Sequence, residues 1–326
     1  MLENKMMAEK VFAEGVAKNI RNFLPPEYQD AEFQAVQTNK NNGVVLAGIQ
    51  VRLPQQNIRP IIYVESYFNK IRHGAPVAQV MNQIAESIKE ASRNPIINSE
   101  FNLMDYDSFK EYLAVMLVNT RANRNMLQEM PHETIEDLSA ICYVDLPIGS
   151  DGSSVTMKVK NDHLALWNVD KKEVFQQARE NEQPANIPIF CSIGEKGMDI
   201  VNIRMEVSNL LDENVSVNPN ALMYALTNVK KNYGASMITQ PEVLQKLEQI
   251  FPDGFYVLPS SIHEVLILPD DGWNEPKMLG ETVREANQKG VDRQEVLSDR
   301  VYSYDKDKHQ IRQEPESIQR RKELER

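Results

Sequence analysis

Helically spaced and alternating apolar positions dominate the first third of the chain. Apolar residues recur every three to four positions from Leu2 to Phe23, the spacing of an amphipathic helix, and Pro25 and Pro26 end it. The pair Asn42-Gly43 separates two apolar runs, which is typical of a β-hairpin. Residues 1–93 are therefore predicted to form an α-β-β-β-α unit. Its elements are a helix at 3–23, strands at 33–38, 44–53 and 59–67, and a helix after Pro76.

The middle region, residues 94–185, is predicted to form a hairpin and helices that pack on this N-terminal unit. Alternation on both sides of the turn at 150–152 indicates the hairpin. Asp170 and Glu173 are spaced as a capping box at the start of a helix. The predicted elements are a short helix at 106–112, a strand at 114–120, hairpin strands at 139–146 and 155–160, and helices that contain Trp167 and residues 171–181.

The remaining chain divides by periodicity into three parts. Residues 186–220 are interrupted by prolines and show no decisive period, so we expect a connector between lobes, in which residues 187–192 could form a short strand. Residues 221–305 are predicted to form a C-terminal α/β lobe, and residues 306–326 a polar, flexible tail. The lobe's predicted elements are strands at 222–227, 235–238, 255–258, 265–268 and 300–304, a helix from Gln240 with a Thr239/Glu242 capping box, and a helix ended by Gly290.

These patterns define the expected fold class. The chain is predicted to be an α+β protein with two helix-covered, mostly antiparallel sheets, an α-β-β-β-α N-terminal unit and a polar C-terminal tail. A chain of 326 residues is long enough for two domains or one bilobed unit.

Charge and cysteine content narrow the function classes. The net charge of -11 makes nucleic acid an unlikely partner, because affinity for it comes from neutralising phosphates with Lys and Arg. The two cysteines, Cys142 and Cys191, have no disulfide or metal spacing, which suits a reducing cytoplasm. The first twenty residues are interrupted by charges, so we expect no signal peptide, and no stretch is long and apolar enough to suggest a membrane protein.

The segment Ser260-Ser261-Ile262-His263-Glu264, between two apolar runs, is the candidate catalytic cluster. A nucleophilic serine needs a base within hydrogen-bond reach, and a third group to orient that base. Residues on one tight turn usually diverge, and there is no Gly-x-Ser-x-Gly elbow, so a purely structural turn is the favoured interpretation. A zincin site is excluded, because the position four residues after His263 is Ile267.

Two further motifs have competing interpretations. Asn119, Arg121 and Asn123 combine a cation with amides and could bind an anion, although a solvated strand end is favoured. The Asp270-Asp271-Gly272 sequence could hold a cation, although such triplets more often form plain turns. No glycine-rich phosphate loop occurs, so neither a cofactor nor a metal is predicted.

Several stretches carry a resemblance to a known family. They are LVNTRAN, EMPHETIEDLSAICYV, VKNDHLALWNV, FYVLPSSIHEVLILPD, VREANQ and EVLSDRVYSYD, and together they span most of residues 1–305. The chain resembles a family called domain of unknown function 5688, from anaerobic Gram-positive bacteria. The resemblance implies no established activity and carries over no catalytic residue. Such proteins are often encoded near mobile elements, an association that suggests a host–element or defence role.

The sequence therefore favours a non-enzymatic binding or regulatory protein that engages another protein. The alternative is a hydrolase that uses Ser260 or Ser261 as the nucleophile with His263 as the base. The identity of the partner and the oligomeric state are not specified by the sequence.

Overall fold

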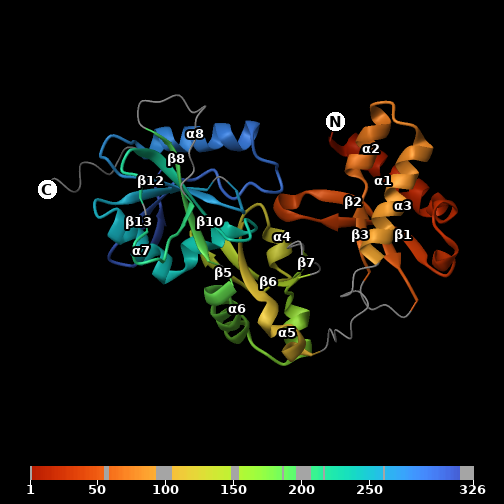
Figure 1. Ribbon diagram of the computed structural model, residues 1–326, viewed down its shortest axis with the longest axis horizontal. Helices are drawn as coiled ribbons and strands as arrows, with labels where there is room; N and C mark the ends of the chain where they lie inside the picture. The colour runs from red at the N-terminus through yellow and green to blue at the C-terminus, as the bar shows by residue number, and fades with distance from the viewer. Residues whose placement is uncertain are drawn as a thin grey trace. The chain divides into compact units, whose positions relative to one another are not determined.

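The chain divides into two compact units, residues 1–102 with 146–153 and residues 103–145 with 154–326 (Figure 1). The computed structural model describes residues 2–54, 59–92, 105–147, 154–185, 187–195, 207–215, 217–259 and 261–315. The predicted start of the middle region at Asn94 and the predicted turn at 150–152 lie outside the described residues. Of the predicted middle region, residues 103–145 and 154–185 belong to the second unit, and residues 94–102 and 146–153 belong to the first.

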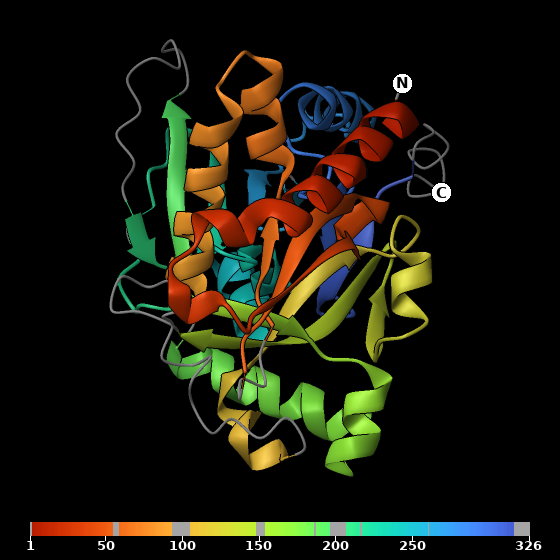
Figure 2. The same ribbon diagram turned by 90° about the vertical axis from the view of Figure 1, so that its right-hand side faces the viewer.

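The first unit is a three-stranded antiparallel sheet with helices packed on it. Helix α1 contacts both β1 and β2 and crosses them in Figure 2. The predicted hairpin forms, with Asn39 paired to Val45 and Asn42 at φ 57 in the turn. The elements are α1 Leu2–Asn19, β1 Glu32–Asn39, β2 Val45–Arg52, β3 Ile61–Tyr63, α2 Glu65–Arg72 and α3 Val77–Ser92.

Helix α2 replaces the end of the predicted third strand. That strand was expected to reach Tyr67, but β3 ends at Tyr63 and the chain turns into a helix at Glu65. Tyr67 and Ile71 are four residues apart, one helical turn, and both pack on the core. The core is formed by α1, β2 and α3, and its fully buried members include Ile20, Ile49, Val80, Ile84 and Ile88.

The second unit begins with a four-stranded sheet in which β6 pairs with β4, β5 and β7. Strand β5 was not predicted, because HETI is short and carries two ionisable residues. It forms through a two-residue turn in which Glu136 adopts a φ of 56° and Ile135 pairs with Leu138. The elements are β4 Leu113–Asn119, α4 Arg124–Leu127, β5 His132–Ile135, β6 Leu138–Pro147, β7 Ser154–Lys158, α5 Asn161–Trp167 and α6 Lys171–Ala185.

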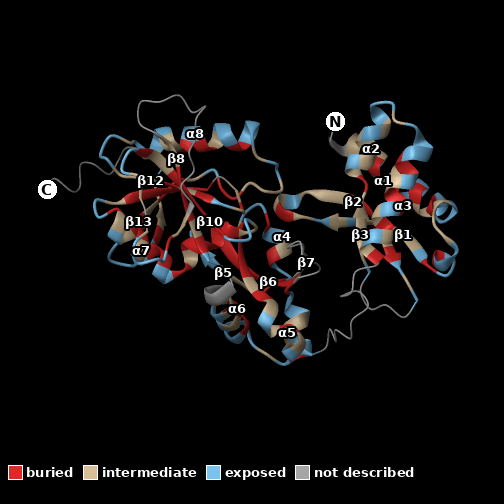
Figure 3. Cartoon of the chain, in the orientation of Figure 1, coloured by how far each residue is buried: buried red, intermediate tan, exposed pale blue. Residues whose placement is uncertain are grey.

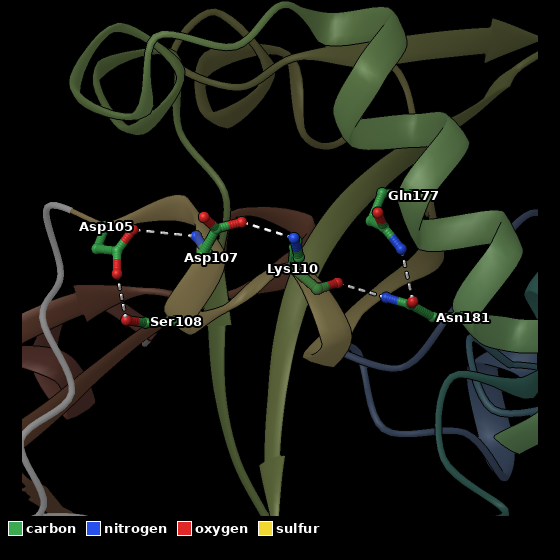
Figure 4. Close-up of polar contacts among 6 residues, drawn as sticks. All are labelled: Asp105, Asp107, Ser108, Lys110, Gln177 and Asn181. Carbon is green, nitrogen blue, oxygen red and sulfur yellow. Dashed lines mark hydrogen bonds and ion pairs between the residues drawn. The ribbon is translucent and has the colours of Figure 1, made fainter.

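Polar contacts fix the entry to β4 (Figure 4). Asp105 begins the 3-10 turn Tyr106–Ser108, because its carboxylate accepts hydrogen bonds from the Asp107 N–H at 3.2 Å and the Ser108 hydroxyl at 2.9 Å. Asn181 of α6 donates to the carbonyl of Lys110 at 2.5 Å. The predicted capping by Asp170 is also present, since its Oδ1 accepts from the Glu173 N–H at 2.8 Å. The bonds of Asn181 to the Lys110 carbonyl and, at 3.0 Å, to the Leu113 carbonyl hold α6 against the start of β4.

A seven-stranded antiparallel sheet, in the order β14-β13-β11-β12-β10-β8-β9, forms the rest of the second unit. Strand β8 lies within the segment predicted to be a connector. Its residues Phe190 and Cys191 are buried against β10, so this segment is part of the sheet. The elements are β8 Pro188–Glu195, β9 Val207–Asn209, β10 Ala221–Asn228, α7 Pro241–Ile250, β11 Phe255–Leu258, β12 Val265–Pro269, α8 Pro276–Lys289, β13 Tyr302–Asp305 and β14 Gln310–Gln313.

Two predictions in this unit were wrong. The segment 235–238, expected to be a strand, is part of a 3-10 helix, Gly234–Thr239. Residues 234–238 are all buried, so the sequence shows no alternation of apolar and polar residues that would distinguish a strand from a helix. Thr239 does not cap α7, because its hydroxyl donates to the Ser236 carbonyl and Gln240 occupies the N-cap position.

The predicted tail is ordered further than expected. Residues 310–313 form β14 and pair with β13, because Ile311 is an apolar side chain that becomes buried opposite Tyr304. Residues 316–326 lie outside the described part of the chain.

The α+β class with antiparallel, helix-covered sheets is confirmed, but the described residues form three sheets where two were predicted. The middle region supplies the additional sheet. Figure 3 shows the buried strands β6 and β10 in red and the exposed outer face of α8 in pale blue. Within the described ranges, no helix is both long enough and apolar enough to cross a membrane.

Candidate functional site

The candidate catalytic cluster lies in the turn between β11 and β12. Ser260 lies outside the described residues. The Ser261 hydroxyl accepts a hydrogen bond from the His263 N–H at 3.0 Å, and the Ser261 N–H donates to the Glu264 carbonyl at 3.2 Å. A serine hydroxyl that bonds the backbone two residues on is a common way to close a turn. Ser261 therefore has a structural role in this geometry, and Glu264 is exposed.

The His263 ring packs on the segment that follows β10. Its Nδ1 accepts a hydrogen bond from the Tyr233 N–H at 3.2 Å, and the two rings stack with centroids 5.5 Å apart. Its Nε2 lies 3.8 Å from Glu295 Oε1. Since Nδ1 accepts, Nε2 carries the proton of the neutral ring. Among the described residues, no hydrogen bond joins this ring to the Ser261 hydroxyl.

The segment 228–234 is held in one conformation by close contacts. The Asn228 side chain donates to the Asn232 carbonyl at 2.7 Å and accepts from the Asn232 N–H at 3.1 Å. Tyr233 has a φ of 54°, which is uncommon for a residue with a side chain. A Cβ on Gly234 would lie 2.6 Å from the Asn228 nitrogen and 2.7 Å from the His263 oxygen. Glycine is therefore required where this segment meets the β11–β12 turn.

The candidate anion site consists mainly of structural amides. Asn119 accepts from the Ala122 N–H at 3.0 Å, and buried Asn123 donates to the Asn119 carbonyl at 2.9 Å. Both bonds close the turn after β4. Arg121, the one charged residue of the three, is exposed at the tip of that turn.

A cluster of hydrogen-bond donors around the Asp137 carboxylate, which the sequence did not predict, lies beside Asn119. Asp137, in the β5–β6 turn, accepts hydrogen bonds from the Ser298 hydroxyl at 2.8 Å, from the Tyr302 hydroxyl and, at 3.4 Å, from Asn119 Nδ2. Burial raises the pKa of the Tyr302 phenol, and the neighbouring Asp137 carboxylate raises it further. The cluster fastens the four-stranded sheet to the seven-stranded sheet within the second unit.

We expect the second unit to lose stability as the pH rises above about 10, the usual pKa of tyrosine. Folded Tyr302 keeps its proton at pH values where the unfolded chain has released it, so its stabilising contribution is complete below pH 10 and is lost above it. The loss is about 1.4 kcal/mol per pH unit. Urea unfolding between pH 9 and 11, followed by the fluorescence of buried Trp167, measures this slope. The Tyr302→Phe variant is expected to show a shallower slope, and an unchanged slope would contradict the assignment.

The most unusual surface feature is the Trp273 turn, which we define as residues 270–278. Trp273 is 89% exposed and Met278 is 58% exposed. The turn is internally bonded, because Asp271 Oδ1 accepts from the Trp273 N–H at 3.0 Å and from Asn274 Nδ2 at 2.9 Å. The sequence signal was a tryptophan placed directly after Asp270-Asp271-Gly272 and shortly before a proline-initiated helix.

The acidic pair in this turn serves the backbone. Asp270 Oδ1 accepts from the Gly272 N–H at 3.0 Å, and Gly272 has a φ of 77°. These bonds match the interpretation of the triplet as a plain turn. Within the described ranges, no group of three or more His, Cys, Asp or Glu side chains is placed to hold a metal ion.

The fold and this site define an α+β protein of helix-covered antiparallel sheets that presents an ordered, exposed tryptophan. A family model described as a family of unknown function, DUF5688, matches residues 9–306, and the chain belongs to that family. Searches among curated proteins and among solved structures gave no match.

Proposed function

We propose that this is a non-enzymatic binding protein that engages a partner protein through the Trp273 turn. The observation that carries the proposal is the 89% exposure of Trp273. Large apolar side chains are normally buried, and tryptophan is among the residues that dominate the energy of protein interfaces. Asp271 fixes the backbone that presents the indole, so little conformational entropy is lost when a partner covers it.

The charge around the Trp273 turn indicates the chemistry of the partner. Asp271, Glu275 and Glu281 are exposed within eight residues of Trp273 in the chain, and Lys277 is the exposed cation in the same stretch. The net charge of the chain is also negative, at -11. The proposed partner is therefore a protein with an apolar slot for Trp273 and Met278 bordered by Lys and Arg side chains. The same acidic residues disfavour an anionic membrane surface.

Trp273→Ala is expected to weaken binding of the purified partner about 30-fold, because loss of an interface tryptophan typically costs about 2 kcal/mol. A photo-crosslinking amino acid at position 273 identifies the partner in the native cell, and titration of the purified pair then measures affinity. Leu166→Ala, which removes another exposed apolar side chain from the same unit, is the matched control and is expected to bind as the wild type does. Equal affinities for the Trp273→Ala and wild-type proteins would overturn the proposal.

Two further measurements distinguish binding of a basic protein from binding of a membrane surface. Association with the partner is expected to slow as salt is raised, since opposite charges steer the encounter. Binding to vesicles of anionic lipid that depends on Trp273, without a protein partner, would assign the turn to membranes instead. The proposal places the protein in the cytoplasm, where its two buried cysteines stay reduced.

The rival function is a hydrolase with Ser260 or Ser261 as nucleophile and His263 as base. It requires the His263 ring to turn from its contact with Tyr233 toward a serine hydroxyl. Covalent labelling of Ser260 or Ser261 by a fluorophosphonate probe, lost in His263→Ala, would establish this function. The binding proposal expects no such labelling.

A further inference from the structure

A pocket of about 560 Å³ lies in the second unit, between the segment before β10, helix α7 and the end of β12. Its inner wall includes the rings of Tyr224 and Phe251, which are almost fully buried and have centroids 5.3 Å apart. Val217, Ile250 and Pro269 also line it. A volume of this size falls within the range of small-molecule sites.

One polar side interrupts this apolar lining. Lys246 and Gln249 both come from α7 and are three residues apart, which places them on the same face of the helix. Lys246 Nζ donates to the Asp212 carbonyl at 2.9 Å, which holds the ammonium in position and uses one of its three N–H groups. In the described part of the chain, Lys246 makes no ion pair, and no carboxylate residue lines the pocket.

We infer that this pocket binds a small monocarboxylate, with its apolar body against Tyr224 and Phe251 and its carboxylate on Lys246. The apolar lining excludes strongly hydrated ligands, because burying their polar groups without partners is unfavourable. Lys246 is half-buried as a residue, and its ammonium, which has no carboxylate partner in the described part of the chain, selects an anionic head group through a charge-assisted hydrogen bond. Gln249, which lines the same pocket from α7, supplies an amide as a second donor. This site is separate from the Trp273 turn and goes beyond the proposed function.

Octanoate and octan-1-ol are the probes that test this site, because they share an apolar body and differ in charge. Each is titrated into the full chain, and binding is followed by displacement of 8-anilinonaphthalene-1-sulfonate. Octanoate is expected to bind about tenfold more tightly than octan-1-ol, because its carboxylate forms one charge-assisted hydrogen bond that the alcohol cannot form. Equal binding of the two, or binding of neither, would overturn the inference.

Three variants locate the site. Lys246→Met keeps an apolar stem and removes the ammonium, so it is expected to abolish the preference for octanoate while octan-1-ol still binds. Val217→Trp fills the pocket and is expected to reduce binding of both probes at least tenfold. Lys277→Met removes an exposed lysine from α8 and is the matched control, expected to bind as the wild type does. Octanoate affinity that is the same in Lys246→Met as in the wild type would place the binding elsewhere and contradict the inference.

Discussion

Gly234→Ala is expected to destabilise the second unit by about 3 kcal/mol, near the upper end of what overpacking a tight site costs. The added Cβ would lie 2.4 Å from the Thr227 hydroxyl oxygen, 2.6 Å from the Asn228 nitrogen and 2.7 Å from the His263 oxygen. Two of these atoms belong to the backbone, so a rotamer change cannot relieve the contact. The segment 228–234 must move away from the β11–β12 turn, and the Tyr233–His263 contacts are lost with it.

Urea unfolding followed by tryptophan fluorescence measures this loss. Trp167 lies in the second unit and is 6% exposed, so its emission changes when that unit unfolds. Gly280→Ala is the matched control in the same unit, because the nearest atoms to its added Cβ are 3.6 and 3.9 Å away. Gly280 lies inside α8, so this variant is expected to be more stable by roughly 0.5–1 kcal/mol. Similar effects from both glycines would contradict the close approach at Gly234.

Asp137→Ala is expected to cost about 3 kcal/mol, since hydrogen bonds to a charged group contribute more than neutral ones. The substitution leaves the hydroxyl of Tyr302 without its acceptor in a site where this side chain is fully buried. A buried polar group that loses its partner is costly. The Ser298 hydroxyl and Asn119 Nδ2 lose the same acceptor.

The size of the stability loss shows whether Asp137 joins the two sheets or only forms part of the β5–β6 turn. Glu136→Gln changes the neighbouring, exposed carboxylate and is expected to alter stability by less than about 0.5 kcal/mol. Ser298→Ala removes one of the donors and is expected to cost about 1 kcal/mol. If Asp137→Ala and Glu136→Gln unfold at the same urea concentration, the cluster does not join the two sheets.

Local patterns in the sequence predicted the elements that local chemistry determines. The β1–β2 hairpin depends on the backbone freedom of Asn42 and Gly43, and both adopt positive φ. Helix α8 ends at Lys289 beside Gly290, the stop that the sequence indicated. These features require no knowledge of distant contacts.

The remaining features depend on residues far apart in the chain. Asp137 meets Ser298 across 161 residues and Tyr302 across 165, so no short motif marks this cluster. The buried 3-10 helix at 234–239 was mistaken for a strand because a short, fully buried run lacks periodicity. The turn at Ser261 was anticipated, but the approach of His263 to Tyr233 and Glu295 depends on how three segments pack.

The exposure of Trp273 is likewise a tertiary property, and the proposed function depends on it. The chain contains two tryptophans, Trp167 and Trp273, which are 6% and 89% exposed. Incorporation of 5-fluorotryptophan therefore gives one ¹⁹F signal for the candidate binding residue and one for a buried internal control. The Trp273→Phe variant assigns the two signals.

The central claim is tested most directly by titrating the fluorinated protein with the purified partner, which is the protein that photo-crosslinking at position 273 identifies. The proposal predicts that the Trp273 signal shifts as the partner covers it and loses its sensitivity to exchange of H₂O for D₂O. The Trp167 signal is expected to stay in place. A Trp273 signal that remains solvent-sensitive when the partner is saturating would contradict the proposed function.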